Sequence, residues 1–65
     1  MISDNLRHIR KEVCKFTQAQ LSELTGIPQS TYSGWERNIS EPTASQVVIL
    51  AKVFNVPIEM LLQTR

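Results

Sequence analysis

Apolar residues recur at helical spacing along the chain, in segments that Gly, Pro and Asn separate. The first segment predicts a helix from about Asp4 to Lys15, with Ser3 as its N-cap. At about 100° per residue, its apolar side chains form one narrow stripe: Leu6, Ile9, Val13 and Phe16. Arg10 lies at the edge of this stripe. The other basic residues lie on the far side: Arg7, Lys11 and Lys15.

The stretch TQAQLSELTGIPQSTYSGWERN, residues 17–38, predicts two short helices joined by a single glycine. Thr17 and Gln20 form a capping box of the form T-x-x-Q, which marks the start of the first helix. Gly26 is expected to end that helix, because the position after a helix commonly needs a positive φ. Two leucines of the helix are predicted to point inward: Leu21 and Leu24.

The second helix of this pair is predicted from Pro28 to about Arg37, since proline is well tolerated in a first turn. Asn38 can end it in the left-handed conformation. Tyr32 and Trp35 share one side and are predicted to pack inward. The opposite arc, about 140° wide, carries amide, hydroxyl and guanidinium groups and one glycine: Gln29, Ser30, Ser33, Gly34 and Arg37.

Two further helices are predicted after the loop ISEP. Thr43 and Gln46 form a second capping box and open a segment that contains VVILAKVF. This segment is apolar nearly all round, which predicts a central buried helix. A buried strand is the competing interpretation, because Val and Ile are strand formers, but the cap and two alanines favour a helix. Asn55 is expected to end it, and Pro57 to open a short last helix that ends near Leu62.

The 65 residues, 1–65, are therefore predicted to form a single all-α domain of five short helices without strands. A domain of this size is only marginally stable, and its one cysteine, Cys14, cannot form an intrachain disulfide. Compact helix packing or oligomerisation must then supply the stability. We expect a soluble cytoplasmic protein, because we find no signal peptide and no membrane-spanning apolar run.

The candidate chemistry points away from catalysis and metals. The only histidine is His8, so no Cys/His cluster with zinc spacing exists. No nucleophile–base pair or phosphate-cradling glycine loop is present, and we expect neither an enzyme nor a cofactor. Net charge is +1, from seven Lys/Arg against six Asp/Glu. A general polyanion binder is unexpected at that charge. Binding of nucleic acid would therefore depend on the local placement of charged side chains.

The polar arc of residues 28–37 has the chemistry of a helix that reads the major groove of DNA. Glutamine can bond adenine bidentately, arginine pairs with guanine or phosphate, and serine bonds either. A glycine would let the helix approach the bases. The helix pair at 17–38 therefore predicts a helix-turn-helix, with its second helix in the groove and its first across the backbone. Gln18, at the start of the first helix, would lie near the same phosphate strand.

These residues are similar to the helix-turn-helix family of phage Cro proteins and repressors, also called the xenobiotic-response-element family. The matching residues are T-Q-x-x-L-S-x-x-T-G-I at 17–27 and S-T-Y-S-x-W-E-R-N at 30–38. Pro42, LAKVFNVP at 50–57 and the closing MLL follow. The resemblance covers nearly the whole chain. It implies a lambda-repressor-like five-helix fold that binds a two-fold-related operator as a dimer.

The resemblance also assigns roles to single residues. Gln18 resembles a glutamine that binds phosphate and steadies the first residue of the recognition helix, and Gln29 resembles that residue, which reads a base. Ser30 and Gly34 fall at the other base-reading positions. Two residues fall where phosphate contacts end the motif: Arg37 and Asn38. Pro28 stands where the family usually has a capping Ser or Thr.

An ion pair and a dimer interface are also expected. Glu36 resembles a glutamate that pairs with a basic residue of the first helix, either Arg10 or Lys11. The helical wheel favours Arg10, whose edge position lets its head group reach inward. Five apolar residues exceed what a small core obviously needs, and are either core or a dimer seam: Ile39, Val56, Ile58, Met60 and Leu61.

We therefore expect a sequence-specific double-stranded DNA-binding transcriptional regulator of bacterial or phage origin. A repressor that occludes a promoter as a homodimer, without an attached sensor domain, small-molecule ligand or membrane partner, fits these residues best. The alternative is a protein-interaction or antitoxin-type docking module of the same fold.

Overall fold

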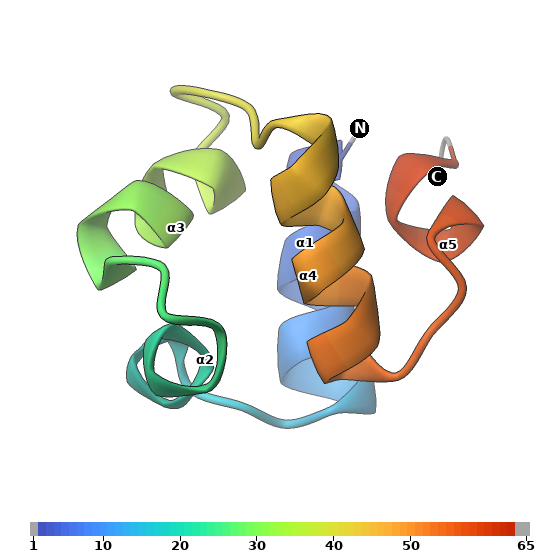
Figure 1. Cartoon of the computed structure of the whole chain (residues 1–65), viewed down its shortest axis with the longest axis horizontal. Helices are drawn as coiled ribbons and strands as arrows, with labels where there is room; N and C mark the ends of the chain where they lie inside the picture. Colours follow the sequence, from blue (N-terminus) through green and yellow to red (C-terminus); the bar gives the residue numbers. More distant parts are fainter. Residues whose placement is uncertain (1, 64–65) are drawn as a thin grey trace.

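The computed structural model describes residues 2–63, and within that range every regular element is a helix. The elements are α1 (Ile2–His8), the π-helix η1 (Ile9–Val13), α2 (Gln18–Thr25), α3 (Gln29–Glu36), α4 (Ala44–Phe54) and α5 (Glu59–Leu62). In Figure 1, α2 and α3 lie on the left, α4 in the centre with α1 behind it, and α5 on the right. The all-α prediction is confirmed.

The core lies where these short helices meet. α1 packs against α3 and α5, and α2 packs against α3 and α4. Each main element places at least one large side chain there with 0–1% of its surface exposed: Leu6, Leu21, Tyr32, Leu50 and Leu61. Because the helices are too short to be stable alone, this shared apolar contact holds each of them in place.

Four of the predicted start and stop signals are confirmed: Thr17, Gly26, Thr43 and Asn55. The Thr17 hydroxyl accepts from the Gln20 backbone N–H, and the Gln20 side chain accepts from the Thr17 N–H at 2.8 Å. Thr43 makes the same reciprocal pair at the start of α4. Gly26 ends α2 with φ 76°, and Asn55 ends α4 with φ 58°.

The single helix predicted from Asp4 to Lys15 is wrong in its second half. Ile9–Val13 forms a π-helix, in which the N–H of Cys14 donates to the carbonyl of Ile9, five residues earlier, at 2.8 Å. The wider turn places Cys14 rather than Val13 over Ile9. Cys14 therefore packs against the core, while Val13 is 53% exposed.

The start of the first helix also differs from the prediction. α1 begins at Ile2, and Ser3, predicted as the N-cap, is a buried residue inside the helix. Asn5 is fully buried, and its side-chain N–H group donates to the carbonyls of Leu61 at 2.8 Å and Gln63 at 2.6 Å. This asparagine fastens the first helix to the end of the last.

Two expectations about burial are wrong. Leu24 is 56% exposed, because α2 makes only two turns and meets the core through Leu21. α4 is a helix, as preferred over a strand, but it is not buried all round: Val48 and Ile49 are 40% and 39% exposed. The last helix begins at Glu59, two residues after Pro57, which was expected to open it. No helix among residues 2–63 is long and apolar enough to cross a membrane.

Candidate nucleic-acid interface

The turn between α2 and α3 is held by hydrogen bonds from small side chains. Gly26 takes the left-handed conformation, and its N–H donates to the carbonyl of Ser22. The Ser22 hydroxyl donates to the carbonyl of Ile27 at 2.7 Å. The Thr25 hydroxyl donates to the carbonyl of Leu21 and accepts from the N–H of Ile27. The angle between the two helices is therefore set by local bonds as well as by packing.

The aromatic pair anchors α3 to the core as predicted. Tyr32 and Trp35 are 1% and 2% exposed, and their rings meet edge to face with centroids 5.9 Å apart. The Tyr32 hydroxyl lies 3.5 Å from the carbonyl of Leu6. Burial raises the pKa of Tyr32, and the neighbouring carboxylate of Glu36 raises it further, so the hydroxyl stays protonated.

The opposite side of α3 is open and polar. Gln29, Ser30 and Arg37 are exposed and Ser33 is half-buried. Together with Gln18 from the start of α2, these side chains line one shallow hollow. The structure thus brings together five of the seven predicted DNA-binding residues.

The start of α3 offers further donors beside this hollow. Pro28 occupies the N-cap and makes no side-chain capping bond. The first N–H groups of a helix have no partner inside the helix, so here they are open to solvent or to an anion. The helix dipole favours negative charge at the same end.

The two remaining predicted DNA-binding residues lie elsewhere. Gly34 is buried, and a Cβ added there would meet the Ser40 hydroxyl oxygen at 3.4 Å. The expectation that Gly34 lies on the open arc is therefore wrong, because the loop after α3 folds back over it. Asn38 follows the helix, is exposed, and has the left-handed φ of 60° that its side chain tolerates.

A buried ion pair fixes the end of α3 to the first helical segment. The Arg10 Nε and Nη2 atoms donate to the two carboxylate oxygens of Glu36 at 2.6 Å and 3.0 Å. Arg10 also donates to the carbonyl of Phe16 at 2.9 Å, whereas Lys11 is exposed. Of the two candidates, Arg10 is therefore the partner of Glu36, as the helical wheel favoured.

The hydrogen bonds around the Glu36 carboxylate determine its ionisation state. Burial alone would raise its pKa, but the bonds from Arg10, Tyr32 and Gln18 and the charge of Arg10 together lower it. The bond to Glu36 likewise raises the pKa of Arg10. Both groups are therefore charged, and α3 ends on a fixed carboxylate inside the protein.

Gln18 and Arg7 also converge on Glu36. The side-chain N–H of Gln18 donates to a Glu36 carboxylate oxygen at 3.0 Å. Among residues 2–63, Gln18 is therefore steadied by Glu36 and makes no hydrogen bond to Gln29. Arg7, expected on the far side of its helix, donates to the Glu36 backbone carbonyl at 3.1 Å and pairs with Asp4 at 2.9 Å.

Sequence reasoning missed this contact of Arg7. The only available signal was its position three residues before Arg10, on the neighbouring arc of one helix.

The comparison with known families decides the class of the protein. The sequence model described as helix-turn-helix matches residues 6–61, which span the ion pair, the turn and the aromatic anchors. The chain belongs to the helix-turn-helix family.

Two known proteins of regulatory function are similar to this helix-turn-helix chain. The HTH-type transcriptional regulator YobD of Bacillus subtilis (strain 168) is 37% identical over 62 residues, which are 95% of this chain and 54% of YobD. The chain thus spans about half the length of that relative. The crystal structure of SinR, the master regulator for biofilm formation, in complex with DNA superposes with a TM-score of 0.88 at 28% identity. That match covers 97% of this chain and 100% of the SinR chain.

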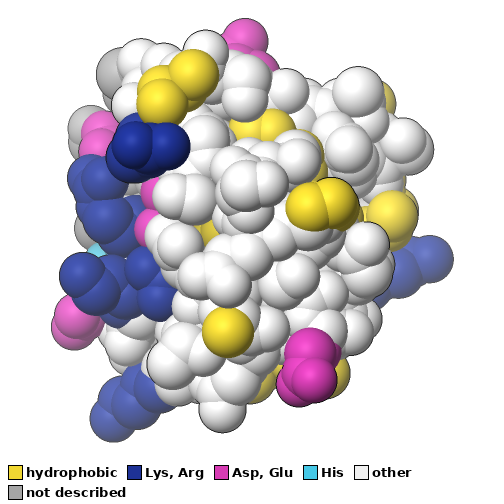
Figure 2. All heavy atoms as spheres, turned by 90° about the vertical axis from the view of Figure 1, so that its left-hand side faces the viewer, with side chains coloured by type: hydrophobic (Ala, Val, Ile, Leu, Met, Phe, Trp, Pro, Cys, Tyr) yellow, Lys and Arg dark blue, Asp and Glu magenta, His cyan; other side chains and the backbone are white. Residues whose placement is uncertain are grey.

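Basic side chains lie along one edge of the helix-turn-helix. Figure 2 views the molecule from the side of α2 and α3, and most of the Lys and Arg side chains visible there lie along the left edge of that face, with another at the right edge. Arg7 and Lys11 line a common hollow on the first helical segment, together with Asp4 and Glu12. The positive charge of this segment is therefore partly balanced by acidic neighbours.

The candidate dimer residues separate into three groups. Leu61 is 0% exposed and belongs to the core, so of its two alternatives, core or seam, the structure shows the core. Val56 and Ile58 are half-buried and pack against the core. Ile39 and Met60 are 68% and 36% exposed and are free to meet a partner. Among residues 2–63, no three His, Cys, Asp or Glu side chains are grouped to hold a metal ion.

Proposed function

We propose that this chain binds double-stranded DNA as a transcriptional regulator, with α3 in the major groove. The observation that carries the proposal is the open polar side of α3, held outward by the buried Tyr32 and Trp35. The similarity to SinR, a structure solved in complex with DNA, supports it. The similarity to YobD, named a transcriptional regulator, supports the regulatory role.

Each side chain of the hollow has a role in this proposal. Gln29, at the first position of α3, reads a base edge, and Ser30 and Ser33 bond bases or phosphate beside it. Gln18 has a second amide hydrogen left after its bond to Glu36, and donates it to a phosphate. Two residues at the end of α3 contact the backbone: Arg37 and Asn38.

We further propose that the protein acts as a homodimer on a two-fold operator and represses by covering the promoter. Repression by occupying the promoter needs no contact with another protein, so a DNA-binding domain of this kind suffices for it. The symmetry of the operator would mirror that of the dimer, with half-sites about one helical turn apart. A cytoplasmic location beside bacterial or phage DNA follows from this role.

The test compares two substitutions on a site selected from random oligonucleotides. Gln29→Ala should cost about 1–3 kcal/mol on that site and relax its specificity at one base pair. Arg37→Ala should weaken all sequences alike and reduce the salt dependence, which is about 0.9 decades per decade of salt for each phosphate contact. Thr31→Ala is the matched control, since Thr31 is exposed on the same helix but outside the hollow.

Fluorescence anisotropy at several salt concentrations measures all three variants. Equal, sequence-independent effects of Gln29→Ala and Arg37→Ala would refute the assigned roles. Absence of salt-sensitive binding to any DNA would refute the function itself. It would then favour a docking module of the same fold.

A further inference from the structure

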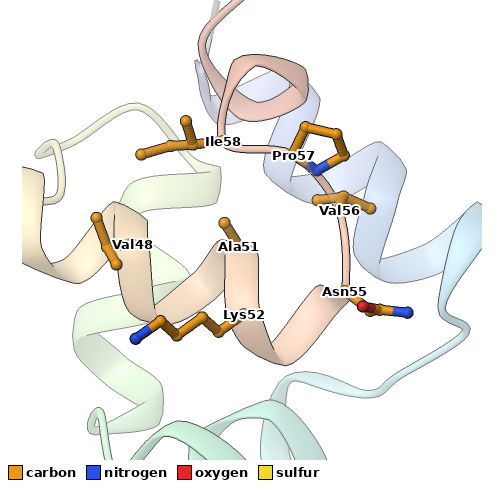
Figure 3. A pocket seen from close by; sticks show the side chains of 7 residues that line it. All are labelled: Val48, Ala51, Lys52, Asn55, Val56, Pro57 and Ile58. Atoms are coloured by element: carbon orange, nitrogen blue, oxygen red, sulfur yellow. The ribbon is translucent and has the colours of Figure 1, made fainter.

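An exposed apolar surface runs along α4 and the segment that leads to α5. Figure 3 shows one of its two hollows, which lies between Val48, Ala51 and Lys52 of α4 and Val56–Ile58. The second hollow lies between Ala44 and Val48 on one side and Leu62 on the other, with Glu41 at its border. Val48 and Ile58 line both hollows, so they form a ridge between them.

Part of this surface extends beyond the contacts of the core. Val48 is 40% exposed and Leu62 is 58% exposed, although the pattern of α4 is that of a helix covered on all sides. None of the residues that line the hollow of α3 lines either of these hollows. Asn38, which we propose for a DNA contact, lines the second hollow, so the two surfaces adjoin at the end of α3.

The charges on the two sides of the ridge have opposite sign. Lys52 borders the first hollow and Glu41 borders the second. Both are exposed, and among residues 2–63 neither has an ion-pair partner. A surface with a cation at one end and a carboxylate at the other is complementary to a copy of itself turned through 180°.

Helix geometry places Ala44 and Lys52 at equal distances on either side of Val48. Ala44, Val48 and Lys52 follow one another at single-turn intervals on one face of α4. With a rise of about 1.5 Å per residue, Ala44 and Lys52 lie about 6 Å on either side of Val48. A two-fold axis at Val48 therefore sets Lys52 of one copy over Ala44 of the other, beside the loop that carries Glu41.

We propose that α4 docks antiparallel on α4 of a second copy of this chain, with Val48 at the two-fold axis. Lys52 of each copy pairs with Glu41 of the other, and the small side chain of Ala44 leaves room for the Lys52 stem. The ridge of Val48 and Ile58 then packs against the same ridge of the second copy. The biological purpose of this dimer rests on the proposed function, because a two-fold operator needs two copies, but self-association itself is measurable without DNA.

Sedimentation velocity of the full chain over a range of concentrations, without DNA, tests the proposal. The native sequence should show a reversible monomer–dimer equilibrium. Lys52→Glu and Glu41→Lys should each raise the dissociation constant by about ten-fold or more, because each sets like charges opposite one another. The double variant, with both charges exchanged, should restore dimerisation.

Lys11→Glu is the control, because Lys11 is an exposed lysine on the first helical segment outside both hollows. It should leave the dissociation constant unchanged. The fluorescence of Trp35, which is 2% exposed, reports whether each variant is folded.

Three results would overturn the proposal: a monomer at every concentration, single reversals without effect, or a double variant that does not recover. A monomer that still binds DNA specifically would refute this dimer and leave the proposed function standing. A dimer with the predicted charge dependence but no DNA binding would refute the proposed function and leave the dimer standing.

Discussion

The buried ion pair at the end of α3 gives the sharpest prediction about stability. Arg10→Met keeps the length of the side chain but leaves the Glu36 carboxylate, 4% exposed, without its cation. Breaking a buried pair in this way costs about 3–5 kcal/mol, and the remaining exposure of the Arg10 side chain, 10%, favours the lower end. A domain of this length has a total stability of about 3–10 kcal/mol, so the variant should lie near the edge of folding.

The pH dependence of this variant should have the opposite sign to that of the native protein. In the native protein the pKa of Glu36 is lowered, so its contribution to stability is present above the ordinary carboxyl pKa and is lost as the pH falls through the lowered value. Without Arg10, burial dominates and raises the pKa of Glu36 above its unfolded value. The deficit of Arg10→Met relative to the native chain should therefore shrink as the pH falls from about 7 to about 5.

Urea unfolding followed by the fluorescence of the single tryptophan, Trp35, measures both effects. Lys11→Met is the matched control, because Lys11 is the exposed basic neighbour of Arg10. It should change the free energy of unfolding by no more than about 0.5 kcal/mol. The reasoning would be refuted if the two variants were equally stable, or if the deficit of Arg10→Met grew on acidification.

Substitutions at three further positions test the backbone and the caps. Gly26→Ala should destabilise by about 1–2 kcal/mol in urea unfolding, purely from the left-handed backbone, since no atom lies within 4 Å of the added Cβ. Gly34→Ala should stabilise by about 0.5–1 kcal/mol through helix propensity, and leave DNA affinity unchanged in anisotropy; a loss of affinity would show that Gly34 faces the DNA. Thr43→Ala should lower stability by about 1 kcal/mol in thermal unfolding, and Thr43→Ser, which keeps the hydroxyl, should not.

The sequence predicted those features that local chemistry determines. Thr17 and Thr43 each bond a backbone N–H three residues away, so the sequence alone contains both partners. Gly26 and Asn55 take the left-handed conformation because glycine has no Cβ and the short polar side chain of asparagine tolerates it. The sequence also predicted which side of α3 faces outward. Tyr32 and Trp35 lie on one arc of the helix, and two large aromatic side chains on one arc must pack against the core.

Features that depend on packing between distant segments were missed. The backbone hydrogen bonds of the π-helix span five residues instead of the four assumed for the α-helix that was predicted here, and nothing in the sequence marks the change. Gly34 is covered by a loop whose path no helical wheel describes. For a similar reason, the sequence did not decide whether Leu61 belongs to the core or to a dimer seam. Its burial depends on the first helix, 56 residues away from it at Asn5.

The hydrogen bonds between the Asn5 side chain and the end of α5 make this chain a candidate for circular permutation. The buried amide holds the carbonyls of Leu61 and Gln63 at 2.8 Å and 2.6 Å, so the first and last helices stay side by side. A short flexible linker could close the backbone into a ring there, and new ends could be opened in the exposed stretch 38–41. In such a ring Asn5 would be close in sequence to Leu61 and Gln63. The entropy cost of closing the loop between them would then be largely removed.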